Sequence, residues 1–276
     1  MTGCEKDNNL SDSSKFSSIP VQTSIAPGFI DQVSGIADSK INQGYLWTVE
    51  DSGNPPEIKL LKYDGTVLKK ICLKNAVNRD WEDLALSSGP NNNLSYLYIA
   101  DIGDNDAQHN NYLIYRFPEP SAAIDTVYTW EEISFTYADG AHDAETILVD
   151  HHTKDIYIIT KRDASSKIYK LAYPQNTSSN NTLQYVASFS FSGVVGAAIS
   201  NNGNEILVKT YTDLFYWNRE EGKTIENTLQ EKPMKIGYLQ EPQGEAICFK
   251  NDGSGFFTLS EKGSAPAVTL NFYKRL

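Results

Sequence analysis

The chain has 276 residues, with 24 Lys and Arg against 35 Asp and Glu and a formal net charge of −11. This length allows one sizeable hydrophobic core, and the deficit of basic residues excludes a phosphate-neutralising surface for nucleic acid. The sequence contains no CxxC motif and no Cys/His cluster, so it does not predict a zinc site. We expect Cys72 and Cys248 to be free cysteines in apolar strands.

The first four residues, Met-Thr-Gly-Cys, resemble the end of a bacterial lipoprotein signal. The resemblance implies lipidation of Cys4, and the acidic residues after it are similar to the surface-export signal of Bacteroidetes lipoproteins. The alternative is an accidental match. If the first four residues do end a lipoprotein signal, residues 1–16 comprise the signal remnant and a polar, flexible tether. One folded domain over 17–276 follows. We expect a monomer in the cell envelope (outer membrane, periplasm or surface) that contacts the membrane only through the lipid anchor at Cys4.

Short apolar strands opened by small or acidic residues recur along the chain. They begin near residues 33, 80, 142, 194 and 242, and they read VSGIADS, DWEDLAL, HDAETILVD, VVGAAIS and PQGEAICF. A second apolar segment follows each, within GYLWTVEDSG, LSYLYIADIGDN, KDIYIITKRD, NEILVKTYTD and GSGFFTLSEKG. Third and fourth segments follow in most units. Aligning the first strands places five residues at one equivalent position: Ser34, Glu82, Glu145, Ala197 and Glu245.

Four-stranded units that repeat every ~40–50 residues are typical of β-propeller blades. We therefore predict an all-β fold, a five-bladed β-propeller. The fifth unit ends after its third strand, so a strand from SSIPVQTSIAP near the N-terminus is expected to complete it and close the ring. The second unit is longer than the others, and a partial blade hidden in it would make six.

The first strand of each propeller blade lines the central channel. We expect carboxylates from these strands and from the ends of the second strands to converge near the axis and bind a divalent cation: Glu82, Glu145, Glu245, Asp101 and Asp51. Calcium is the expected cation, because it takes about six to eight oxygen ligands. A second set is expected to bind substrate at the same rim: His142, Lys161, Arg162, Lys209 and Glu261.

Three interpretations of these charges remain open. In the first, the carboxylates hold Ca²⁺. In the second, they pair with cations in a structural network: Arg79, Lys161, Arg162, Lys209 and Lys262. In the third, acids and cations bind a substrate directly, with one carboxylate as general base. The first and third can coexist, since a metal activates water or binds a phosphate.

The repeated D-x-E-x-apolar opening, in DWEDLA, HDAETIL and the relaxed QGEAICF, resembles a group of propellers that includes the β-propeller phytases and the SdiA-regulated, esterase-like phytase domains. The resemblance implies an acidic, calcium-binding channel. The chain departs from that pattern at Asp83, Thr146 and Ala246, where Gly is usual. We expect a binding module for a small molecule or an envelope protein. The alternative is a Ca²⁺-dependent hydrolase, phosphoesterase-like (phytase-like) or lactonase-like, so whether the chain is an enzyme stays open.

Overall fold

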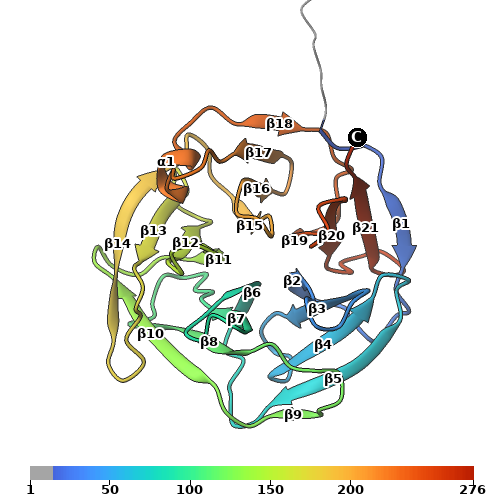
Figure 1. Cartoon of the computed structure of the whole chain (residues 1–276), viewed down its shortest axis with the longest axis horizontal. Coiled ribbons are helices and arrows are strands. Elements are labelled where there is room, and N and C mark those ends of the chain that lie inside the picture. Colours follow the sequence, from blue (N-terminus) through green and yellow to red (C-terminus); the bar gives the residue numbers. More distant parts are fainter. Residues whose placement is uncertain (1–14) are drawn as a thin grey trace, which may run out of the picture.

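A computed structural model describes residues 15–276, and its regular secondary structure is almost entirely β-strand, arranged around a central axis (Figure 1). Cys4 and the predicted lipoprotein signal lie outside the described residues. Within residues 15–276, no helix has the length and apolar character needed to cross a membrane. The all-β class and the β-propeller architecture are confirmed.

The strands are ordered from the axis outward (Figure 1). The innermost strands are β2 (Val33–Asp38), β6 (Trp81–Ser88), β11 (Ala144–Val149), β15 (Val194–Ile199) and β19 (Gly244–Phe249). Each pairs antiparallel with the next strand of the chain, namely β3 (Tyr45–Glu50), β7 (Ser95–Asp101), β12 (Ile156–Thr160), β16 (Glu205–Thr210) and β20 (Gly255–Ser260). The third strands are β4 (Glu57–Lys62), β8 (Tyr112–Pro118), β13 (Lys167–Leu171), β17 (Leu214–Asn218) and β21 (Thr269–Lys274). The outer strands are β5 (Val67–Leu73), β10 (Glu131–Tyr137), β14 (Asn181–Ser188), β18 (Met234–Ile236) and β1 (Val21–Ser24), and one short helix, α1 (Ile225–Leu229), precedes β18.

The two ends of the described chain meet in one sheet. Strand β1 pairs antiparallel with β21, with Val21 opposite Phe272. A β-bridge joins Phe16 to Arg275, and the Phe16 side chain is fully buried against Phe256. The packed region therefore includes Phe16, one residue before the boundary expected at 17.

The extra length of the second repeat covers the edge of the first sheet. Strand β9 (Thr126–Val127) lies between β8 and β10 in sequence, but it pairs parallel with β5, with Thr126 opposite Cys72. Strands β10 and β14 also pair parallel, which joins the second and third groups of strands into one eight-stranded sheet. Both parallel pairings occupy outer edges that would otherwise offer free backbone groups for association.

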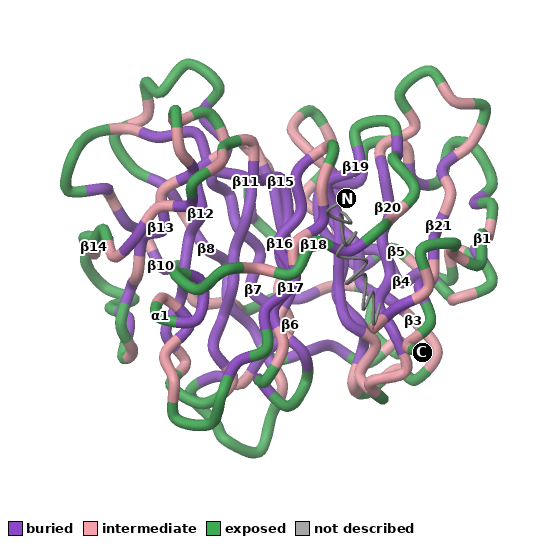
Figure 2. The backbone as a smooth tube through the Cα atoms, turned by 90° about the horizontal axis from the view of Figure 1, so that it is seen from above, coloured by how far each residue is buried: buried purple, intermediate pink, exposed green. Residues whose placement is uncertain are grey.

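The apolar core lies between neighbouring sheets, and exposed residues are concentrated in the connecting loops (Figure 2). Trp81 is fully buried between strands β2–β5 and strands β6–β8, where its indole N–H donates to the Val77 carbonyl at 3.1 Å. Large aromatic side chains occupy the second strands in the same way: Trp47, Tyr98, Tyr157 and Phe257. Cys72 and Cys248 are free, as expected.

Candidate cation site

Each innermost strand has a shift in pairing register near its start. One residue in each strand is skipped, and the skipped residues are Ser34, Glu82, Glu145, Val195 and Glu245. A β-bulge of this kind re-aims a side chain relative to the regular ladder. In the fourth strand the equivalent residue is Val195, so the alignment that placed Ala197 there is wrong by two residues.

The bulges bring carboxylates from three strands together, as the repeat predicted. Oxygens of Asp51, Asp80 and Glu82 lie within 4.8 Å of one another, and we call this set the first carboxylate group. Oxygens of Glu82, Glu145 and Glu245 satisfy the same limit and form the second carboxylate group. Glu82 belongs to both, and it links the two groups into one acidic cluster.

A lysine occupies the second carboxylate group. The Lys161 ammonium forms an ion pair with Glu145 and lies 3.7 Å from Glu245 Oε1. Tyr211 accepts a hydrogen bond from Lys161 at 3.0 Å and donates one to Glu245 Oε1 at 2.5 Å. Lys161 therefore supplies the structural counter-charge here, although one oxygen, Glu145 Oε2, is buried without a hydrogen-bond partner among the described residues.

The first carboxylate group has no such counter-charge. Within residues 15–276, no Lys, Arg or His forms an ion pair with Asp51, Asp80 or Glu82. Glu82 is 6% exposed, and no hydrogen bond to its carboxylate is found in the described part of the chain. Burying an unpaired carboxylate is costly, so a cation or protons must balance this group.

Burial and mutual repulsion shift the titration of the cluster. Burial, followed by the neighbouring carboxylates, raises the pKa of Glu82 and of Glu145 well above the ordinary range. Burial also raises the pKa of Asp80 to about 6, partly offset by a hydrogen bond from Ser52 and supported by the adjacent Asp51. Burial raises the pKa of Glu261 to about 7, with further contributions from Glu245 and Asp51. The charges of the cluster thus act on Glu261, and its role in substrate binding stays a prediction.

Gly103 permits the close approach of backbone to the first carboxylate group. Its N–H donates to the Asp80 carbonyl at 3.2 Å. A Cβ atom at this position would collide with Asp80 Oδ2 and Glu82 Oε1. Absence of a side chain at residue 103 therefore allows these two carboxylates to lie against the loop that follows β7.

Asp101 lies behind the cluster and belongs to neither carboxylate group. Its Oδ1 accepts the backbone N–H of Asp80 at 2.9 Å and lies 3.6 Å from Arg79 Nε. Asp101 therefore orients the segment that carries Asp80. The pairing with Arg79 makes it a poorer candidate for a cation ligand than Asp80, which sequence reasoning did not select.

Two more residues expected at the substrate rim, His142 and Arg162, have protein partners. His142 lies between Asp139 and Asp163, each 3.1 Å from a ring nitrogen, in a cluster of the third group of strands. Arg162 pairs with Asp143 at 2.6 Å and keeps half of its side chain exposed.

Lys209 lies inside the protein rather than on the rim. It is fully buried, donates to the Gly244 carbonyl and lies 3.3 Å from Glu241. The expectation that Lys209 is on an accessible rim is therefore wrong.

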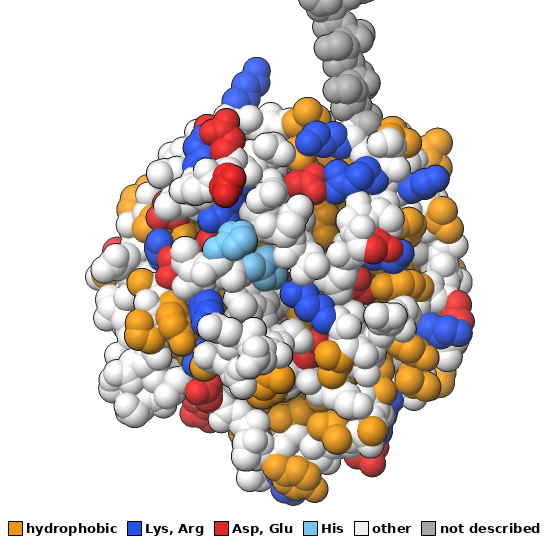
Figure 3. All heavy atoms as spheres, viewed as in Figure 1, with side chains coloured by type: hydrophobic (Ala, Val, Ile, Leu, Met, Phe, Trp, Pro, Cys, Tyr) orange, Lys and Arg blue, Asp and Glu red, His pale blue; other side chains and the backbone are white. Residues whose placement is uncertain are grey.

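Two further residues belong to the cluster, and both have a signal in the sequence. Asp80 opens the same DWEDLAL segment that contains Glu82. Tyr211 directly follows the second strand of its unit, in the same place as Asp51, Lys161 and Glu261 in theirs. The face shown in Figure 3 gives no comparable signal, because charged side chains of both signs are scattered over it.

No protein-family model matches this chain, and no curated protein matches it. Many solved structures are similar to this chain, among them two at low identity. A "Crystal structure of Nidogen/Laminin Complex" has a TM-score of 0.47 at 12% identity, covering 84% of this chain and 73% of that one. A structure of "Kuenenia stuttgartiensis Hydrazine Synthase" has a TM-score of 0.45 at 10% identity, covering 86% of this chain and 70% of that one. Likeness at this level says nothing of function.

Proposed function

We propose that the chain is a five-bladed β-propeller that binds one divalent cation, Ca²⁺ first among them, in the first carboxylate group. Glu82 carries this proposal. Its carboxylate is buried and has no hydrogen-bond partner within residues 15–276, and it links the group that Lys161 balances to the first carboxylate group, which has no protein cation within the same residues. Lys161 balances charge in the second carboxylate group, so only the charge of the first carboxylate group remains for a bound cation. This supports one bound cation rather than two.

The blade count rests on the contacts of the innermost strands. Strand β2 contacts β6, β6 contacts β11, β11 contacts β15, β15 contacts β19, and β19 contacts β2 again. A cycle of five inner strands supports five blades. The pairing of β1 with β21 supplies the outer strand of the last blade, which supports closure of the ring by the N-terminal strand.

The donor set favours a hard cation. Asp51, Asp80 and Glu82 offer only carboxylate oxygens, which suit Ca²⁺ or Mg²⁺ better than a soft transition metal. Calcium tolerates irregular geometry and bidentate carboxylates, whereas Mg²⁺ demands a near-octahedral shell. A bound cation would also relieve the repulsion that raises the pKa values of this cluster.

The cation would serve a binding module for a small molecule or an envelope protein, held at the membrane through Cys4. A hydrolase, phosphoesterase-like or lactonase-like, is the second candidate, and Glu261 favours it. Its pKa of about 7 suits a general base at neutral pH, and it lies beside the proposed cation site. A cation there would polarise a phosphoryl or carbonyl oxygen. Arg162, half exposed, is available for an anionic substrate.

Calcium titration of the purified protein tests the cation site. At a concentration of about 100 times Kd, the cation stabilises the fold by about 2.7 kcal/mol, which raises Tm by roughly 5 °C or more. We expect Glu82→Gln to abolish this shift and Glu132→Gln, at an exposed carboxylate, to retain it. An equal Tm in excess chelator and in millimolar Ca²⁺ would disprove the site.

The enzymatic alternative needs a separate readout. We expect Glu261→Gln to abolish any turnover of a phosphoester and lactone panel while leaving the Ca²⁺-dependent Tm shift in place. A variant that hydrolyses the panel as fast as the parent protein removes Glu261 as the base. Incorporation of labelled palmitate that is lost in Cys4→Ser tests the anchor.

A further inference from the structure

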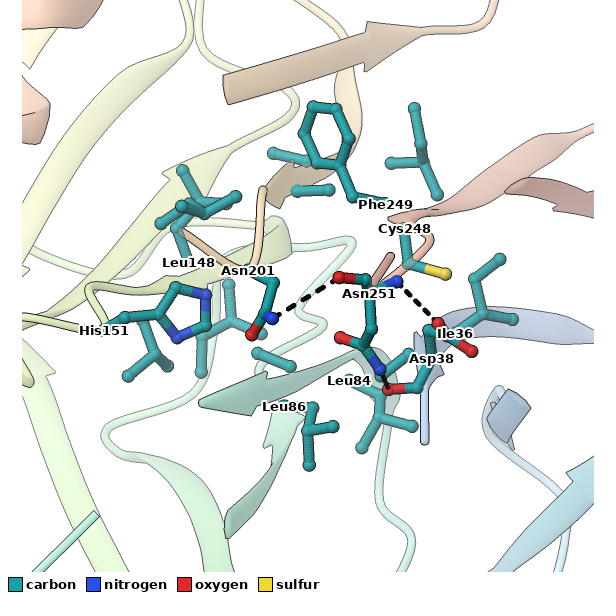
Figure 4. A pocket seen from close by; sticks show the side chains of 18 residues that line it. Ile36, Asp38, Leu84, Leu86, Leu148, His151, Asn201, Cys248, Phe249 and Asn251 are labelled. Atoms are coloured by element: carbon teal, nitrogen blue, oxygen red, sulfur yellow. Dashed lines mark hydrogen bonds between the residues drawn. The ribbon is translucent and has the colours of Figure 1, made fainter. Parts of the chain in front are cut away.

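A cavity lies inside the ring of innermost strands, on the side away from the carboxylate cluster (Figure 4). It has a volume of about 50 Å³, and its walls are mostly apolar side chains of β2, β6, β11, β15 and β19. Polar residues are found where these strands end: Asp38, His151, Asn201 and Asn251. The volume exceeds the roughly 10–15 Å³ that one water needs.

Close contacts between backbones separate this cavity from the cation site. A Cβ atom at Gly35 would collide with the backbone of Asp83 and Leu84, and one at Gly196 would collide with the Glu245 carbonyl. Both glycines directly follow the bulge residues of their strands. Two neighbouring pairs of inner strands, β2 with β6 and β15 with β19, therefore touch just beyond the carboxylates, and this constriction lies between the cation site and the cavity.

The cavity continues into a groove on the surface. Asp38, Asn201 and Asn251 line both spaces, and the groove has a volume of about 490 Å³. Asn251 donates its backbone N–H to Asp38 Oδ2 at 2.7 Å, and Tyr63 donates to Asp38 Oδ1 at 2.5 Å. These bonds hold the Asp38 carboxylate in the wall of the groove.

A half-buried ammonium in this groove has no partner. Lys40 lines the groove, and no hydrogen bond or ion pair to its ammonium is found within residues 15–276. Glu119, the acid whose charge acts on Lys40, already accepts bonds from Ser39, Ser95 and Trp47, at 2.6, 2.6 and 3.0 Å. Burial lowers the pKa of Lys40, partly offset by Glu119. The positive charge also acts on the ring of His151, which lines the cavity.

We propose that the cavity and groove form a second ligand site, for a small carboxylate with a short apolar chain. The chain would enter the cavity between Leu84, Leu148 and Phe249, where removal of apolar surface from water is favourable. The carboxylate would meet the Lys40 ammonium, which gains a charge-assisted hydrogen bond. This site is independent of the cation site, because the constriction separates the two.

Methyl NMR with sodium butyrate tests the proposal on the full protein. We expect butyrate to shift the methyl signals of Ile36, Ile147 and Ile247, which line the cavity, and to leave unchanged those of Ile58 and Ile133, which are buried but do not line it. Lys40→Met should weaken butyrate binding about tenfold, the size expected for one bond to a charged group. Lys74→Met, at an exposed lysine, should leave it unchanged.

Two further ligands and variants decide between outcomes. Butanol of equal chain length should bind more weakly than butyrate, and equal affinity would overturn the anionic assignment. Ala85→Leu fills the cavity and should abolish the shifts. If Ala85→Leu folds poorly, Lys40→Met alone still tests the proposal. Lys40 is half exposed, so we expect its replacement to leave the fold intact. No shift of the three cavity methyls at 50 mM butyrate, a concentration on the order of weak ligand Kd values, would overturn the proposal.

Discussion

The Lys161 ammonium pairs with Glu145 and lies 3.7 Å from Glu245, so it occupies the space that a cation would take in the second carboxylate group. Its side chain is 12% exposed, which makes this a largely desolvated ion pair. Removing one partner of such a pair leaves an uncompensated charge in the interior. The protein thus carries its own counter-charge on one side of Glu82 and lacks it on the other.

Lys161→Met should destabilise the protein in chelator by about 3 kcal/mol, because Glu145 and Glu245 lose their counter-charge. Added Ca²⁺ should restore much of this loss and raise the bound stoichiometry from one to two. Urea denaturation with and without Ca²⁺, together with metal analysis, measures both effects. Lys62→Met is the control at an exposed pair and should change little. A stoichiometry that stays at one would show that Lys161 does not exclude a second cation.

Stability in chelator should fall as the pH rises through the range of the first carboxylate group. The Asp80 pKa is raised to about 6 in the folded state, above the ~3.9 of an unfolded aspartate. Between these values the folded state binds more protons than the unfolded state, so the free energy of unfolding decreases with rising pH.

Comparing Asp80→Asn with the parent protein separates the contribution of Asp80 to the pH dependence of the free energy of unfolding from that of the other carboxylates. The variant should show a smaller decrease in the free energy of unfolding between about pH 4 and pH 6. Calcium affinity of the parent should increase over the same range, because the cation competes with protons. Parallel pH profiles for the two proteins would contradict the raised pKa.

Gly103→Ala should weaken Ca²⁺ binding about tenfold or more and cost about 1–3 kcal/mol of stability, because the new methyl group collides with Asp80 and Glu82. Isothermal titration and urea denaturation report the two effects separately. Gly237→Ala is the control, since its methyl group would meet only the Ser18 side chain, at 3.1 Å. Unchanged affinity in Gly103→Ala would mean that the carboxylates do not need the close approach of the loop.

The repeat revealed the axial glutamates because three of the five units carry the same pattern of an acidic residue before an apolar run. DWEDLAL, HDAETILVD and QGEAICF align on the glutamate alone. In VVGAAIS no charged residue marks the position, and side chains alternate with a period of two along a strand. Val195 and Ala197 share that parity, so the pattern could not separate them, and only the bulge register did.

The sequence could not predict which charged residues neutralise the carboxylate cluster and which add negative charge to it. Lys161 and Asp51 both directly follow a second strand, yet Lys161 neutralises the cluster and Asp51 adds to it. By sequence Asp101 is an equally good candidate ligand, and only its contacts with Asp80 and Arg79 in the folded chain distinguish it. Such pairings depend on side-chain geometry between strands that are distant in sequence, which no local pattern encodes.

Phe16→Ala should test whether the N-terminal segment closes the ring. The Phe16 ring is fully buried, 5.0 Å from the ring of Phe256 and 6.1 Å from that of Tyr216, so it packs against both β20 and β17. Truncation of a buried Phe costs about 3–5 kcal/mol. Ile19→Ala, at a side chain that is 80% exposed, should cost less than about 0.5 kcal/mol. If both variants unfold at the urea concentration of the parent protein, the segment before β1 does not contribute to the ring, and closure would rest on the pairing of β1 with β21 alone.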